Sequence, residues 1–99
     1  MKYIRTKDGR VVEYGYFNNY EYIRGGDTLE ELCDEFVFHT KDGHEQHFLS
    51  HGHLEDVLSN KNIDLKEYLS CRTIYGAIWT DKGLIYVAKM NNKGELELL

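Results

Sequence analysis

The sequence predicts an α+β fold: a curved antiparallel sheet of about five to seven strands, built from hairpins, with two or three short helices on one face. Three observations lead to this class. A short turn motif that ends in Gly occurs four times, runs typical of strands flank every copy, and one stripe of apolar residues has helical spacing. The 99 residues fit a single domain, 1–99, because domains usually have about 100–150 residues.

The turn motif places the hairpins. TKDG occurs at residues 6–9 and 40–43, the permuted TDKG at 80–83, and the related NNKG at 91–94. Gly reaches positive φ without a steric penalty, which the last position of such hairpin loops requires. Each copy is therefore predicted to be a hairpin turn.

The strands follow from these turns. The runs on either side of them predict strands at residues 2–6, 10–14, 35–40, 44–49, 73–80, 84–90 and 95–99. The run 84–88 is apolar on both faces, which indicates a central strand covered by helices. The run 95–98 alternates Glu and Leu, as in an edge strand with one solvated face.

The helices are predicted from apolar spacing. Leu29, Leu32, Cys33 and Phe36 fall at i, i+3, i+4 and i+7 and form one stripe, and Asp27 is the expected N-cap. Leu54, Val57 and Leu58 predict a second helix over 53–59. Leu65, Tyr68 and Leu69 predict a third over 64–69.

Composition excludes several function classes. Twelve basic and seventeen acidic residues give a net charge of −5, which argues against direct binding of nucleic acid or an anionic membrane. No apolar run reaches the roughly 18 residues of a membrane span, and the N-terminus lacks the apolar region of a signal peptide. The two cysteines, Cys33 and Cys71, are expected to be reduced, with Cys33 in the core. We expect a cytoplasmic protein.

The predicted partner-binding residues are the acidic side chains of the first helix: Asp27, Glu30, Glu31, Asp34 and Glu35. A solvated helix face is the alternative explanation. In a helix, however, Glu30/Asp34 and Glu31/Glu35 would be like-charge i,i+4 pairs, each costing about 0.2–0.5 kcal/mol. Such local conflicts often mark functional positions, so we expect this face to contact a basic surface of a partner protein.

Two other clusters of residues are alternative candidates for a functional site. All five histidines lie within residues 39–53: His39, His44, His47, His51 and His53. A small regulatory module that binds a metal or ligand there is the alternative function, but strand alternation places His44 and His47 on opposite faces, so no metal site is predicted.

Six large aromatics among the first 22 residues suit sheet packing or a second contact surface: Tyr3, Tyr14, Tyr16, Phe17, Tyr20 and Tyr22. No catalytic motif occurs, so neither an enzyme nor a cofactor is predicted.

Three segments carry a resemblance: MKYIRTKDG, GDTLEELCDEFV and YGAIWTDKGLIYVAKMNNKGELELL. They resemble small proteins encoded by temperate phages and mobile elements of Gram-positive bacteria. The resemblance implies an accessory protein in the cytoplasm of a host bacterial cell. Such acidic proteins include inhibitors of host defence nucleases, among them anti-CRISPR proteins. The resulting hypothesis is a non-catalytic, phage-encoded protein that inhibits a bacterial defence protein with a basic surface, such as a CRISPR nuclease; the partner and the oligomeric state stay open.

Overall fold

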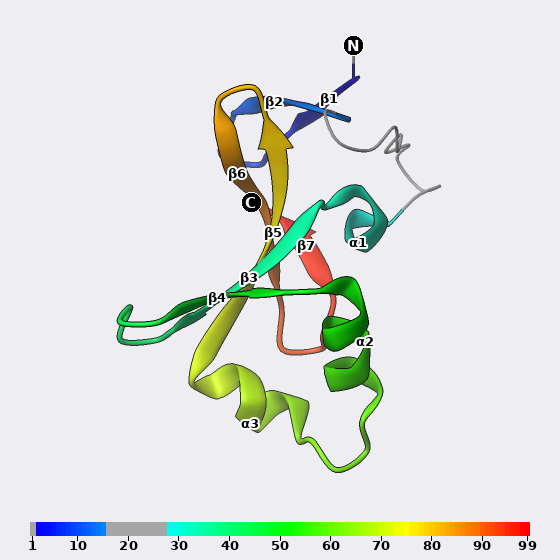
Figure 1. The fold of residues 1–99 in the computed structure, drawn as a ribbon, viewed down its shortest axis with the longest axis vertical. Coiled ribbons are helices and arrows are strands. Elements are labelled where there is room, and N and C mark those ends of the chain that lie inside the picture. Colours follow the sequence, from blue (N-terminus) through cyan, green and yellow to red (C-terminus); the bar gives the residue numbers. More distant parts are fainter. Residues whose placement is uncertain (1, 16–27) are drawn as a thin grey trace.

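The fold was analysed in a computed structural model, which describes residues 2–15 and 28–99. Seven strands and three short helices follow one another along these residues (Figure 1): β1 (Lys2–Arg5), β2 (Val11–Tyr14), α1 (Leu29–Leu32), β3 (Glu35–Thr40), β4 (Gln46–Leu49), α2 (His51–Ser59), α3 (Leu65–Ser70), β5 (Arg72–Thr80), β6 (Gly83–Met90) and β7 (Leu96–Leu98). The predicted α+β class is confirmed.

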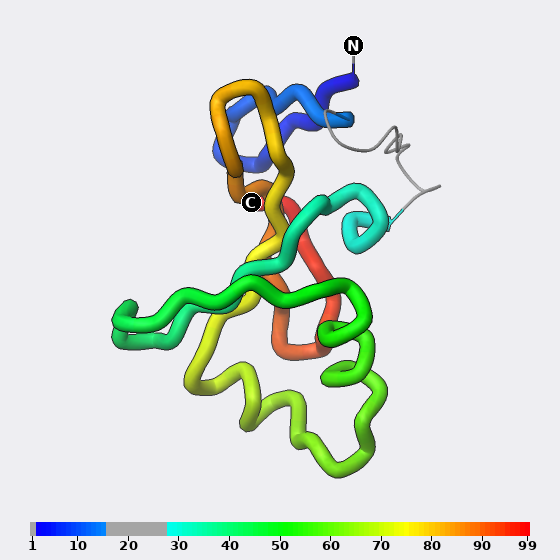
Figure 2. The backbone as a smooth tube through the Cα atoms, viewed as in Figure 1, coloured from blue at the N-terminus to red at the C-terminus, as the bar shows by residue number. Residues whose placement is uncertain are grey.

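The strands form two antiparallel sheets. β1 and β2 pair with each other, and the larger sheet has the order β4-β3-β5-β6-β7. The predicted hairpins between residues 2–6 and 10–14 and between 73–80 and 84–90 are both present. As expected, β6 lies inside the sheet and β7 at its edge. Turns connect β3 to β4, β5 to β6 and β6 to β7, as the path of the chain in Figure 2 shows.

The four glycines of the turn motif all have the predicted positive φ: 91° at Gly9, 76° at Gly43, 107° at Gly83 and 81° at Gly94. In the TKDG copies the Gly N–H donates to the Thr carbonyl, over 3.2 Å from Gly9 to Thr6 and 2.9 Å from Gly43 to Thr40. The repeated motif is thus a repeated turn.

The sheet is curved by a bulge between β5 and β6. Gly76 lies opposite Ala88, but the next residue, Ala77, lies opposite Tyr86, so Val87 is the additional residue on β6. A bulge bends the strand and increases its twist. The end of β5 and the start of β6 lie near the small sheet (Figure 1).

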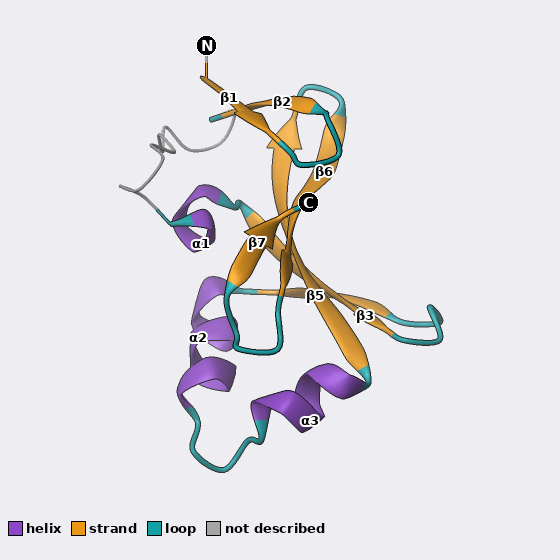
Figure 3. Ribbon diagram, turned by 180° about the vertical axis from the view of Figure 1, so that it is seen from behind, coloured by secondary structure: helices purple, strands orange, loops and turns teal. Residues whose placement is uncertain are grey.

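The core lies on one face of the large sheet. Phe36 stands opposite Leu49 of β4 and Gly76 of β5, and Phe36, Ile74 and Ile78 are fully buried. The ring of Phe36 contacts His51 of α2 edge-on, with 4.7 Å between ring centroids. The helices therefore cover the Phe36 face, and the view from behind shows α1 and α2 close to β7 (Figure 3).

The small sheet closes the other end of this core. Ile4, Val12 and Tyr14 are buried in the same cluster as the large sheet. Arg10 Nη2 donates to the Tyr86 carbonyl over 3.0 Å, and the Lys7 backbone N–H donates to the Leu99 carbonyl. The first hairpin is therefore fastened to β6 and to the chain end.

The first helix is shorter than the apolar stripe predicted. It ends at Leu32, Cys33 is its extended C-cap with ψ 132°, and Phe36 lies on β3. Extended backbone from residue 35 onward can pair with both β4 and β5, and the like-charge pairs of a longer helix are avoided. Thr28 caps the helix by accepting from the Glu31 N–H over 3.3 Å, whereas the predicted cap, Asp27, lies outside the described residues.

The other two helices agree closely with prediction. α2 begins two residues early, because the Ser50 hydroxyl accepts from the His53 N–H over 3.1 Å and caps it. His51, which precedes the predicted helix, and His53, at its predicted start, are thus both in the first turn. Asp64 caps α3 by accepting from the Lys66 and Glu67 N–H groups.

Candidate binding groove between two helices

An apolar groove of about 310 Å³ lies between α1 and α2. Its lining is mostly apolar and consists of Glu30, Glu31, Phe36, His51, Leu54, Glu55 and Leu58. The groove combines an unfilled apolar surface with charge of a single sign, which makes it the best candidate site in the described part of the chain.

Helical spacing builds one wall of the groove. His51, Leu54, Glu55 and Leu58 fall at i, i+3, i+4 and i+7 of α2, so their side chains share one face. Leu54 is buried, whereas Leu58 keeps 38% of its surface exposed. This face of α2 is therefore buried at Leu54 and both apolar and open at Leu58.

The floor and the opposite wall come from the chain around Cys33. Phe36, at the start of β3, is 1% exposed and forms the base. Glu30 and Glu31 of α1 form the second wall, Glu30 half-buried and Glu31 exposed. The turn at Cys33 places α1 beside the sheet, because the Asp34 N–H donates to the Ala77 carbonyl over 2.9 Å.

The electrostatics of the groove favour a cation. Three of its lining residues are acidic, Glu30, Glu31 and Glu55, and none of its described lining residues is Lys or Arg. His51 also lines the groove, and its Nε2 lies 3.0 Å from the Cys33 carbonyl, which can only accept, so Nε2–H is the donor. A positively charged group entering the groove would meet three acids.

The other predicted acids lie elsewhere. Asp34 Oδ2 accepts from the Trp79 backbone N–H over 2.8 Å, and Glu35 Oε1 accepts from Trp79 Nε1–H over 3.4 Å. Desolvation raises the pKa of Asp34 and the nearby Glu35 charge adds to this, whereas the hydrogen bond from Trp79 and the proximity of His51 oppose it. Both residues therefore fasten β3 to β5.

The predicted partner-binding set is thus divided. Glu30 and Glu31 lie in the groove, Asp34 and Glu35 contact Trp79, and Asp27 falls outside the described residues. Glu55, the third groove acid, was missed. Its i+4 and i+3 spacing to His51 and Leu58 is present in the sequence, but its approach to α1 depends on tertiary packing.

The five histidines do not converge. His39 Nε2 and Tyr86 Oη are 2.7 Å apart on one face of the sheet, while His47 stacks on Phe38 with 4.9 Å between ring centroids. Within residues 2–15 and 28–99, no three His, Cys, Asp or Glu residues come together in a way that could hold a metal ion. The histidine-rich segment therefore presents no common site.

The cysteines show opposite environments. Cys33 is 1% exposed, and burial, with the nearby charges of Asp34 and Glu30, raises its pKa to about 12. Such a thiol is protonated and poorly nucleophilic at neutral pH. Cys71 is a free, exposed thiol. The prediction that Cys33 belongs to the core is confirmed.

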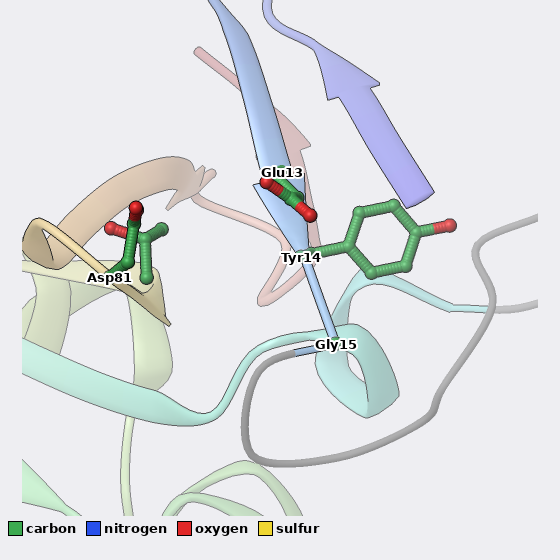
Figure 4. A pocket seen from close by; sticks show the side chains of 5 residues that line it. Glu13, Tyr14, Gly15 and Asp81 are labelled. Atoms are coloured by element: carbon green, nitrogen blue, oxygen red, sulfur yellow. The ribbon is translucent and has the colours of Figure 1, made fainter. Parts of the chain in front are cut away.

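A second hollow, of about 410 Å³, lies between the two sheets and is lined by Glu13, Tyr14, Gly15, Thr80 and Asp81. Figure 4 shows the labelled side chains spread apart, with Tyr14 directed away from Asp81. They do not converge on one point, so this hollow is a weaker candidate than the groove.

The aromatic N-terminal surface is described only in part. Tyr3 is 53% exposed, whereas Tyr14 is buried in the core. Tyr16, Phe17, Tyr20 and Tyr22 lie outside the described residues. Of the described pair, only Tyr3 has an exposed side chain.

Comparisons of the chain with protein-family models, curated protein sequences and solved structures found no match. The resemblance to small phage proteins stays a prediction. Among the described helices, none has the length and apolar character to cross a membrane.

Proposed function

We propose that this chain is a non-catalytic binding protein that inhibits a bacterial defence protein by covering one of its basic surfaces. The observation that supports this proposal is the groove between α1 and α2, whose lining combines apolar residues with three acidic ones. Such a groove can bind a partner through both burial of apolar area and charge complementarity.

Charge supports the same kind of partner. The net charge of −5 steers the chain toward a basic surface, and such steering raises association rates that fall as salt increases. Proteins that handle nucleic acid carry clustered Lys and Arg that neutralise phosphates. An acidic protein seated on that cluster excludes the nucleic acid by occupying its site.

The choice of a defence nuclease, such as a CRISPR nuclease, rests on the resemblance to phage proteins. The carbonyl-bound His51 and the protonated Cys33 thiol offer no activated nucleophile beside the groove. A binding role therefore accounts for the groove better than a catalytic one does.

The test is plasmid survival in bacteria that express a panel of CRISPR nucleases together with this protein. We expect wild type to protect a targeted plasmid and the variant E30Q/E31Q/E55Q to lose protection. The variant E13Q/E67Q/E95Q removes the same charge from exposed positions outside the groove and should protect like wild type. Absence of protection against every nuclease, or equal protection by both variants, would reject the proposal.

A further inference from the structure

The groove can be assigned a ligand more specific than a basic surface. Its floor and its rim differ in chemistry: Phe36 and Leu54 are buried carbon, while Glu30, Glu31 and Glu55 carry charge. An occupant must therefore be apolar along its length and positive at its end. Arginine and lysine side chains have this construction, since a chain of methylenes carries the charged group.

The two helices distinguish arginine from lysine. Glu30 and Glu31 belong to α1 and Glu55 to α2, so the acids approach from opposite walls. A guanidinium has five N–H donors in a planar fork and can donate to carboxylates on two sides at once. An ammonium is a compact point charge that keeps its hydration more strongly. The divided rim thus favours arginine.

An uncharged occupant fits less well. A leucine-like side chain would cover the exposed part of Leu58, but it would offer no hydrogen-bond donor to the acidic residues on the two walls of the groove. A partner segment with net negative charge would be repelled by the acidic residues of the groove. Among side chains, arginine satisfies both the floor and the rim.

We infer that the groove is an arginine-binding site, in which the methylene stem lies along Leu58, the exposed apolar residue of the lining, and the guanidinium donates to Glu30, Glu31 and Glu55. The inference rests on the proposed function and makes it more specific, because it names one arginine of the partner as the anchor.

The experiment uses the whole chain and capped pentapeptides with two Gly on either side of one variable residue: arginine, citrulline, lysine or norleucine. Backbone amide shifts are followed by NMR at increasing peptide concentration. We expect the arginine peptide to shift the amides of Phe36, His51 and Leu54 saturably. Citrulline, which has nearly the same shape but no charge, should bind at least tenfold more weakly, and lysine several-fold more weakly.

Controls separate the site from general attraction. E30Q/E31Q/E55Q should lose the saturable shifts, whereas E13Q/E67Q/E95Q should keep them. Equal binding of the norleucine peptide, or shifts spread over all acidic residues, would overturn the assignment. The plasmid assay has a different readout: saturable arginine binding without protection would reject only the nuclease target, and protection without arginine binding would reject only this site.

Discussion

The backbone N–H of Trp79 donates a hydrogen bond of 2.8 Å to Oδ2 of Asp34, which joins the chain before β3 to strand β5. The two residues are 45 positions apart, so the bond fixes a long-range contact. The same tryptophan donates from its ring to Glu35. The acids nearest to β3 therefore have a structural role, and their effect on unfolding can be measured separately from binding.

Removing the Asp34 acceptor should destabilise the fold. Asp34→Ala removes this hydrogen bond, and a hydrogen bond to a charged group contributes about 1.5–3 kcal/mol. Asp34→Asn keeps an oxygen in the same place and should unfold close to wild type. Urea unfolding monitored by fluorescence of Trp79, the only tryptophan, measures both variants. Equal free energies of unfolding for Ala and Asn would contradict the assigned role.

Asp34 should also give the fold a specific pH dependence. Its folded-state pKa lies above the ordinary value of 3.8, so the folded protein binds this proton more tightly than the unfolded chain does. The resulting stabilisation is complete below pH 3.8 and is lost as pH rises through the raised pKa. Asp34→Asn lacks this component, so its stability relative to wild type should increase across that window. A constant difference from pH 3 to 7 in urea unfolding would be inconsistent with a raised pKa.

Gly76 is required because Cys33 occupies the space beside it. A Cβ on residue 76 would lie 2.5 Å from Cys33 Sγ and 3.3 Å from Ala88 Cβ. Gly76→Ala should therefore destabilise the protein by about 1–3 kcal/mol, the usual result of overpacking a core. In a Cys33→Ala background the same change should cost less, giving a coupling of about 0.5–3 kcal/mol in a double-mutant cycle.

Gly52→Ala is the matched control, since nothing lies within 4 Å of its added Cβ on helix α2. It should stabilise the protein by about 0.5–1 kcal/mol. If the effects of Gly76→Ala and Cys33→Ala on the free energy of unfolding were additive, Cys33 would not be what restricts residue 76.

The two thiols should react at very different rates. Cys71 is exposed, whereas the Cys33 thiol is buried and its pKa is about 12. Iodoacetamide at pH 8 should therefore add once to the native protein and twice to protein unfolded in urea, as measured by intact mass. In Cys71→Ser the native protein should stay unmodified over the same time. Rapid labelling of that variant would mean that the core around Cys33 opens readily.

The strands could be predicted because their signals are local. Positive φ at Gly9, Gly43, Gly83 and Gly94 depends on a few neighbouring residues, and each turn fixes the strands beside it. The end of α1 could not be predicted in this way. Apolar positions at Cys33 and Phe36 fit a continued helix as well as a turn into a strand, and both residues are buried in either case. Pairing with β4 and β5 decides between them.

The groove was even less accessible to sequence analysis. Its acids come from α1 and α2, and Glu55 is 24 positions beyond Glu31. A charge count along the chain instead groups Glu30 and Glu31 with Asp34 and Glu35, which the turn at Cys33 directs to Trp79. Proximity in sequence therefore identified two of the three acidic residues of the groove and grouped them with residues that have another role.

This division gives a last prediction, which compares two pairs of equal charge. Glu30→Ala/Glu31→Ala should change the free energy of unfolding by less than about 0.5 kcal/mol, as is usual for surface positions, and should weaken binding of the arginine pentapeptide. Asp34→Ala/Glu35→Ala should lower stability by about 1 kcal/mol or more, because the hydrogen bonds to Trp79 are lost, while the folded molecules still bind the peptide. Urea unfolding and the NMR titration, both at low temperature so that each variant is folded, give the two quantities.

If binding depended only on net charge, both pairs would weaken it equally, and the groove would have no special role. If the first pair lowered stability as much as the second, the acids of α1 would be part of the folded framework and not of a binding site.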